Sequence, residues 1–230
     1  MFPATHEKRD VRSRRPMRQL GAAAQRLGSS PLGGVPRSAM FDELAGNTPF
    51  RDVIIVDANA SPLAIFEALR TVTLRDMKLA WLLGELRYLP ARLLGRQGAG
   101  DSTKPFFASL LNRGTVILAD RTPREIVMGS AGVLHRIVDQ APVHQVDKGS
   151  FHAFSDPAYE KLIMSFRVEA SGRVGHRLIV LEHATVPLSP DAARRFKPYW
   201  SFIRPTGAFV SRQLLKAIAR RAESAMSDAR

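Results

Sequence analysis

The last forty residues limit the possible folds more than any other stretch, because they carry the pattern of one long amphipathic helix. Ser189, Pro190 and Asp191 form an N-terminal helix signal, with proline and an acid following a capping residue. Apolar residues then recur at helical spacing, namely Phe196, Trp200, Ile203, Val210, Leu214 and Ala217. We expect Pro205 and Gly207 to bend this helix midway. A long helix with one apolar side requires an apolar surface against which it can pack.

Candidate β-strands between residues 51 and 187 provide that surface. Residues 52–58 are rich in β-branched side chains, and residues 160–169 alternate between the two sides of a strand. In the second of these, one side carries Leu162, Met164, Phe166 and Val168. The other expected strands are 115–120, 124–129, 135–138, 151–154 and 176–186. Because short turns separate these strands and no βαβ alternation occurs, the pattern predicts an antiparallel sheet.

Two helices are expected directly after the first strand. The first begins at Ser61-Pro62 and continues through Leu69, and the second covers residues 74–94. This order predicts an α+β domain with a helix-grip fold, in which a curved antiparallel β-sheet is wrapped around a long C-terminal helix. The domain is expected to span residues 51–226.

Residues 1–50 differ in composition and predict a basic, disordered N-terminal extension. Residues 1–40 carry eight Lys/Arg and two acids, and residues 191–230 carry nine Lys/Arg and three acids, so the ends hold nearly all of the formal +13. A nucleic-acid surface usually runs along a folded face, and this distribution therefore argues against nucleic acid as a partner. Weak contact of the basic ends with an anionic membrane stays a hypothesis.

Several classes of chemistry are excluded or disfavoured by residue content. The chain has no cysteine, which excludes disulfides, thiolate zinc sites and cysteine nucleophiles. The histidines lack metal-ligand spacing, and no Gly-x-Ser-x-Gly elbow occurs. No apolar run reaches the roughly 18 residues of a transmembrane helix. We therefore predict a cytoplasmic protein with no metal, no cofactor and no recognisable catalytic constellation.

Three segments carry a resemblance to a known family. They are Pro123 to Gly129 (PREIVMG) with Gly132 shortly after, Glu182 to Val186 (EHATV), and residues 191–200. Together they resemble the START-like, Bet v 1-like superfamily (SRPBCC), closest to bacterial members grouped with polyketide cyclases and lipid-transfer proteins. The resemblance extends over about residues 51–224. It implies a hydrophobic cavity between the sheet and the last helix, and a protein that binds, sequesters or transfers a lipid or polyketide-like molecule.

The implied cavity points to eight candidate ligand-binding residues. The polar candidates, which would orient a ligand, are Glu125, Arg167 and Glu182. The apolar candidates, which would form the wall, are Met128, Met164, Phe166, Trp200 and Ile203. A carboxylate within an apolar strand is costly unless it is exposed or paired. Glu125 and Glu182 are therefore alternatively explained as members of structural ion pairs.

Two other functions stay open at this point. An aromatase/cyclase-like enzyme acting on a polyketide would need Glu125 or Glu182 to face the cavity as an acid or base. Binding of nucleic acid or a membrane surface through the basic ends would weaken steeply with added salt. Alternation does not decide which face of the last strand meets the cavity, because both of its rows are apolar.

Overall fold

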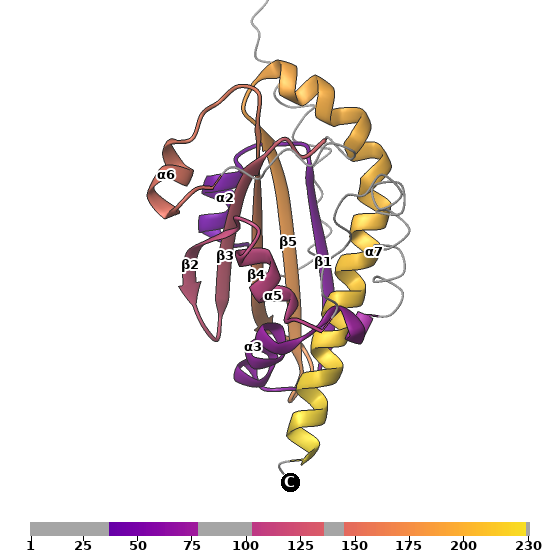
Figure 1. Ribbon diagram of the computed structural model, residues 1–230. Coiled ribbons are helices and arrows are strands. Elements are labelled where there is room, and N and C mark those ends of the chain that lie inside the picture. Colours follow the sequence, from indigo (N-terminus) through magenta and orange to yellow (C-terminus); the bar gives the residue numbers. More distant parts are fainter. Residues whose placement is uncertain (1–36, 78–102, 136–144, 229–230) are drawn as a thin grey trace, which may run out of the picture. The chain divides into compact units, whose positions relative to one another are not determined.

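Five strands form one antiparallel sheet in the computed structural model, which describes residues 37–77, 103–135 and 145–228. The strands are β1 (Arg51–Ala58), β2 (Val116–Arg121), β3 (Glu125–Gly132), β4 (Glu160–Ala170) and β5 (Arg177–Pro187). They lie in the order β1-β5-β4-β3-β2, and every neighbouring pair is antiparallel (Figure 1). The prediction of an α+β chain with an antiparallel sheet is therefore confirmed.

The turn between β4 and β5 is fastened to the end of β1 by one carboxylate. Asp57 accepts hydrogen bonds from Ser171 and Arg173 of the turn and from the ring of His176. Burial alone would raise the pKa of Asp57, but the bonds from His176, Ser171 and Arg173 outweigh it and hold this pKa below its ordinary value. The turn itself contains Gly175 at a φ of 78°, a conformation that favours glycine.

The C-terminal segment forms one continuous helix, α7 (Pro190–Asp228), which packs along one face of the sheet (Figure 1). Ser189 caps it, since its hydroxyl oxygen accepts a hydrogen bond from the Ala192 amide at 3.0 Å. The helix continues without interruption through Pro198 and through Pro205, the position where a bend was expected. Among the residues that the structure describes, none of the helices has both the length and the apolarity needed to cross a bilayer.

The sheet face that meets α7 is named here the helix face, and it carries the larger core. Side chains of α7 and of α3 (Pro62–Thr71) pack on alternate residues of four strands. The buried residues on the sheet side are Ile54, Ala58, Ile126, Met128, Phe166, Val168, Ile179 and Leu181. The helices contribute Ile65, Phe66, Leu69, Leu214, Leu215 and Ile218. The position of α3 confirms the helix predicted from Ser61-Pro62, where Ser61 is the N-cap.

The opposite face of the sheet is also covered, which was not predicted from the residues. Two short helices, α2 (Ala39–Ala45) and α6 (Lys148–Ala153), place Phe41 and Phe151 in a second buried cluster. Figure 1 shows both helices on the side of the sheet away from α7. The expected disorder of residues 1–50 is thus wrong for residues 37–50, because Phe41 and Phe50 are buried. Residues 1–36 lie outside the described residues.

The strand expected at 151–154 is wrong, and the reason is local. Asp147 accepts a hydrogen bond from the Ser150 amide, and the Ser150 hydroxyl accepts one from the Asp147 amide, which together form a capping box. This box starts α6 and directs Phe151 onto the sheet.

A further short helix, α5 (Phe106–Leu111), was not predicted. Of the helix expected at 74–94, only the 3-10 turn η2 (Leu74–Met77) is within the described residues. The strand expected at 135–138 falls almost wholly outside them.

Gly129 makes room for Phe151, and this explains one glycine of the PREIVMG segment. A Cβ atom at position 129 would lie 2.6 Å from Cζ of Phe151 and 2.9 Å from Cδ1 of Leu118. Both neighbours are buried, so neither ring nor methyl has space to withdraw. We expect Gly129→Ala to lower the free energy of unfolding by about 1–3 kcal/mol, measured by urea denaturation. Gly172→Ala, in open space at the β4–β5 turn, is the control, and an equal loss in both variants would contradict this account.

Candidate functional site

The predicted ligand-binding residues lie on two different faces of the sheet. Met128, Met164 and Phe166 belong to the helix face, where they pack in or against the larger core. Glu125, Arg167 and Glu182 lie on the opposite face, because successive residues of a strand point to opposite sides and the strand registers align them there. These six residues therefore do not line one common cavity.

Glu182 is the centre of a buried cluster of charges on the opposite face. Its carboxylate is fully buried and accepts hydrogen bonds from two arginines. Nε of Arg51 lies 2.8 Å from one oxygen, and Nη1 of Arg167 lies 2.8 Å from the other. Arg51 also donates to Asp42 of α2, so the cluster joins β1, β4 and β5 to the helix that covers them. Burial lowers the pKa of Arg51, but its hydrogen bonds to Asp42 and Glu182 outweigh this and raise it above its ordinary value.

Arg167 and Glu125 extend this cluster across the sheet. Arg167 is 2% exposed, and its Nε lies 3.5 Å from the carboxylate of Glu169. The Nε and Nη2 atoms of Arg167 are buried without a hydrogen-bond partner among the described residues. Glu125 accepts a hydrogen bond from the Ser165 hydroxyl at 2.9 Å and lies 3.9 Å from Nη1 of Arg121. Both glutamates are thus held in polar contacts, as the ion-pair explanation of these residues expects.

Of the two candidates on α7, Trp200 belongs to an aromatic cluster near the start of that helix. The ring of Trp200 stacks on Phe196 at a centroid distance of 6.1 Å and meets Phe50 edge-on at 6.1 Å. It also meets the ring of His183 at 6.2 Å. Ile203 is half-buried one turn further along. Aromatic pairs in such geometries stabilise a fold by more than the burial of their apolar area alone would.

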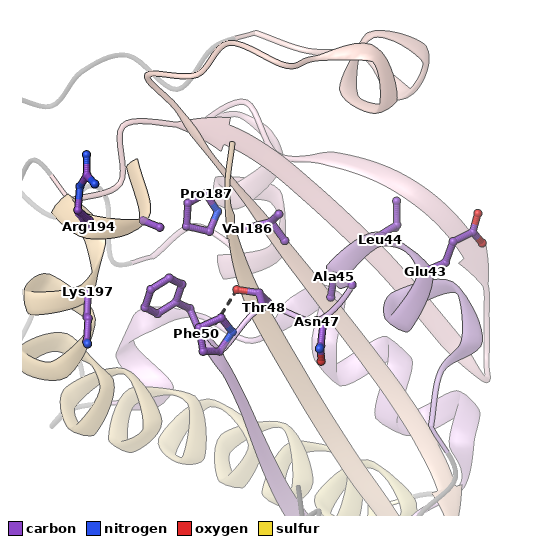
Figure 2. A pocket seen from close by; sticks show the side chains of 13 residues that line it. Glu43, Leu44, Ala45, Asn47, Thr48, Phe50, Val186, Pro187, Arg194 and Lys197 are labelled. Atoms are coloured by element: carbon purple, nitrogen blue, oxygen red, sulfur yellow. Dashed lines mark hydrogen bonds between the residues drawn. The ribbon is translucent and has the colours of Figure 1, made fainter. Parts of the chain in front are cut away.

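A groove of about 510 Å³ lies beside this aromatic cluster (Figure 2). Three segments that are distant in the sequence form it: the end of α2 with the loop into β1, the end of β5, and the first two turns of α7. Most of its lining is apolar, and includes Leu44, Ala45, Pro49, Phe50, Val186, Pro187 and Ala193. The loop is held in place by Thr48, whose hydroxyl donates to the Thr185 carbonyl at 2.7 Å and accepts from the Phe50 amide at 3.3 Å.

Charged side chains stand at the two sides of the groove. Figure 2 shows Arg194 and Lys197 extending from α7 on one side and Glu43 from α2 on the other. Arg194 forms an ion pair with Asp191, whereas Lys197 has no carboxylate within ion-pair distance in the described part of the chain. An apolar hollow with a cationic side suits a molecule with an apolar body and an anionic group. Phe50 connects this lining to Phe196 and Trp200 behind it.

None of the eight predicted ligand-binding residues lines this groove. Residues 43–50 were assigned to the disordered extension, and Arg194 and Lys197 were counted only among the charges of the basic C-terminal end. The sequence contains a weak signal for α2. Ser38 is a typical N-cap residue, and the apolar Phe41 follows it three positions later, about one helical turn away. The Ser38 hydroxyl accepts a hydrogen bond from the Phe41 amide at 3.1 Å. A helix of seven residues is too short to show a convincing period.

His135 and His183 each contact a neighbouring element in the described part of the chain. His135 Nδ1 lies 2.9 Å from the fully buried carboxylate of Glu160, which also accepts from the Leu134 amide at 2.8 Å. This contact holds the chain after β3 against the start of β4. His183 packs beside Trp200 on the helix face. No group of three or more His, Asp or Glu side chains with a metal-binding arrangement occurs within the described ranges.

His183 predicts a pH dependence of stability. Burial lowers the pKa of His183 below its ordinary value, and Arg204 adds to this, while Asp52 and Glu182 act in the other direction. Well above the ordinary histidine pKa of about 6.5, the ring is neutral in both folded and unfolded chains. As the pH falls below that, the unfolded chain binds a proton that the folded chain resists, so the free energy of unfolding decreases.

We expect His183→Gln to lose less stability than the wild-type chain between about pH 6.5 and 5, measured by urea denaturation at several pH values. His152→Gln, which replaces an exposed histidine of α6, is the control for the substitution itself. Identical slopes in wild type and His183→Gln would show that His183 does not titrate with a lowered pKa.

Comparison with known proteins yields little beyond this geometry. No protein-family model matches the chain, and no curated protein matches it in sequence. Among solved structures, the crystal structure of TTHA0849 from Thermus thermophilus is similar with a TM-score of 0.32 and 9% sequence identity. The alignment covers 76% of this chain and 98% of TTHA0849.

Proposed function

We propose that this protein binds a small amphiphilic molecule, with an apolar body and an anionic group, in the groove between α2, the end of β5 and the start of α7. The observation that carries the proposal is the combination of an apolar lining with Arg194 and Lys197 at one side. The volume of the groove, about 510 Å³, lies within the roughly 300–1,000 Å³ that most small-molecule sites have. Apolar burial would supply most of the affinity, and the cations would orient the ligand.

The proposal keeps the class of function inferred from sequence and moves its site. A START-like, helix-grip assignment is supported by the order of elements, with a long C-terminal helix on an antiparallel sheet. It is opposed by the second buried cluster, because α2 and α6 cover the face away from that helix. The enzyme alternative depended on Glu125 or Glu182, and both are held in polar contacts away from the groove.

Decanoate and decanol test the proposal as a matched pair of ligands, one with and one without an anionic group. We expect the full chain to bind both at one site and to bind decanoate about five- to tenfold more tightly, because decanoate alone meets the cations. Ala193→Phe fills the groove and should abolish binding of both molecules. Arg194→Gln combined with Lys197→Gln should weaken decanoate and leave decanol unchanged. Calorimetric titration measures each case.

Two control variants make the result specific. Ala225→Phe adds the same ring at an exposed position near the other end of α7, and should bind like wild type. Lys148→Gln combined with Arg124→Gln removes two exposed cations elsewhere and should leave decanoate binding unchanged. The proposal fails if Ala193→Phe binds decanoate as tightly as the wild-type chain does.

A further inference from the structure

The side of α7 that points away from the sheet exposes two large apolar side chains. Phe202 is 74% exposed and Phe209 is 37% exposed. They are seven residues apart, which is two helical turns, so they lie on one stripe of the helix. The buried residues of the same helix, such as Phe196 and Leu214, lie on its other side. Exposed phenylalanines aligned in this way are not explained by packing against the residues that the structure describes.

Cations lie along the same stripe. Arg195 is seven residues before Phe202, Arg212 is three residues after Phe209, and Lys216 is seven residues after it. All three are exposed, and none has a carboxylate within ion-pair distance in the described ranges. The outward stripe, defined by Arg195, Phe202, Phe209, Arg212 and Lys216, thus combines apolar rings with positive charge that no described carboxylate pairs. This combination is typical of helices that lie in the interface of a lipid bilayer.

We propose that the outward stripe of α7 docks on an anionic lipid bilayer, with Phe202 and Phe209 inserted among the lipids and the cations at the headgroups. Charge complementarity favours this occupant over a second copy of the chain, because pairing two such stripes would bring like charges together. The phenylalanines favour it over nucleic acid, which would meet the cations but leave Phe202 and Phe209 without an apolar environment. The inference goes beyond the proposed function and does not depend on what the groove holds.

Vesicle flotation with the full chain tests this inference. Vesicles of phosphatidylcholine with about 30% phosphatidylglycerol should bind the wild-type chain at least tenfold more tightly than vesicles of phosphatidylcholine alone. Phe202→Ser combined with Phe209→Ser should weaken binding to the anionic vesicles by at least about tenfold, because two apolar rings no longer insert. Arg195→Gln, Arg212→Gln and Lys216→Gln together should weaken it by about 100-fold, at about fivefold for each cation.

Matched controls separate this face from the rest of the molecule. Leu63→Ser removes an apolar side chain that is 56% exposed on α3, and should change binding less than twofold. Lys104→Gln, Arg124→Gln and Lys148→Gln remove the same charge from other exposed positions and should weaken binding far less than the triple variant of α7. All these positions are exposed, so thermal melting should match wild type throughout.

Four results would overturn the inference. The first is equal vesicle binding by wild type and the double phenylalanine variant. The second is equal weakening by the two triple variants, since binding would then follow net charge alone. The third is a dimer in solution that the double phenylalanine variant dissociates, because the stripe would then be occupied by a second copy. Duplex DNA that binds wild type and the double phenylalanine variant alike, but not the α7 triple variant, would assign the stripe to nucleic acid instead.

Discussion

Replacing Glu182 by glutamine is expected to lower the free energy of unfolding by about 3–5 kcal/mol. The carboxylate is fully buried between Arg51 and Arg167, and Arg167 is itself almost completely buried. A neutral amide cannot compensate the buried guanidinium charge of Arg167, whereas Arg51 keeps its contact with Asp42. The cost of an uncompensated buried charge exceeds that of a lost hydrogen bond. Total stabilities of about 5–15 kcal/mol are usual, so a large part of the stability is at stake. Urea denaturation followed by circular dichroism measures the loss.

A double variant separates charge from volume. Glu182→Leu combined with Arg167→Met removes a buried pair and replaces it with apolar side chains, which is often neutral or stabilising. We expect this double variant to have a larger free energy of unfolding than Glu182→Gln. If Glu182→Gln does not fold, the double variant should still fold. Glu67→Gln, at an exposed position of α3, should stay within about 0.5 kcal/mol of wild type. A Glu182→Gln variant within that same margin would show that the cluster does not stabilise the fold.

The second large effect is expected at Phe166, and it distinguishes core from cavity wall. The ring is 1% exposed and meets Phe66 of α3 edge-on at 5.4 Å between centroids. Phe166→Ala should therefore cost about 3–5 kcal/mol, because the packed surroundings cannot close the hole. In the absence of denaturant, Phe166→Ala should still bind decanoate, since Phe166 does not line the groove.

The comparison variant for Phe166 is an exposed phenylalanine of the same chain. Phe202→Ala should change the free energy of unfolding by no more than about 0.5 kcal/mol. A cost near 1 kcal/mol for Phe166→Ala, together with loss of decanoate binding, would instead indicate that Phe166 faces a ligand cavity, as the sequence analysis expected. Denaturation and calorimetric titration of the same samples decide between these outcomes.

Long regular patterns were read correctly from the residues alone. The period of two in residues 160–169 placed Met164, Phe166 and Val168 together, and they do share the helix face. The cap at Ser189 and the recurring apolar residues that follow it located α7. Each of these features depends on backbone geometry within one segment, which a pattern of neighbouring residues reports directly.

Short elements and long-range pairing needed the tertiary structure. Helices α2 and α6 are seven and six residues long, too short for a period, and their omission concealed the second covered face. The partners Arg51 and Glu182 are 131 positions apart, so no local pattern relates them. Alternation states which residues share a face but not what covers it, so it did not reveal that α2 covers the face of Arg167 and Glu182. The same alternation sets Arg167 opposite Phe166, and only the cavity implied by the family resemblance grouped the two residues. The groove likewise exists only where the ends of α2 and β5 meet the start of α7, because a concave surface is a property of segments brought together by folding.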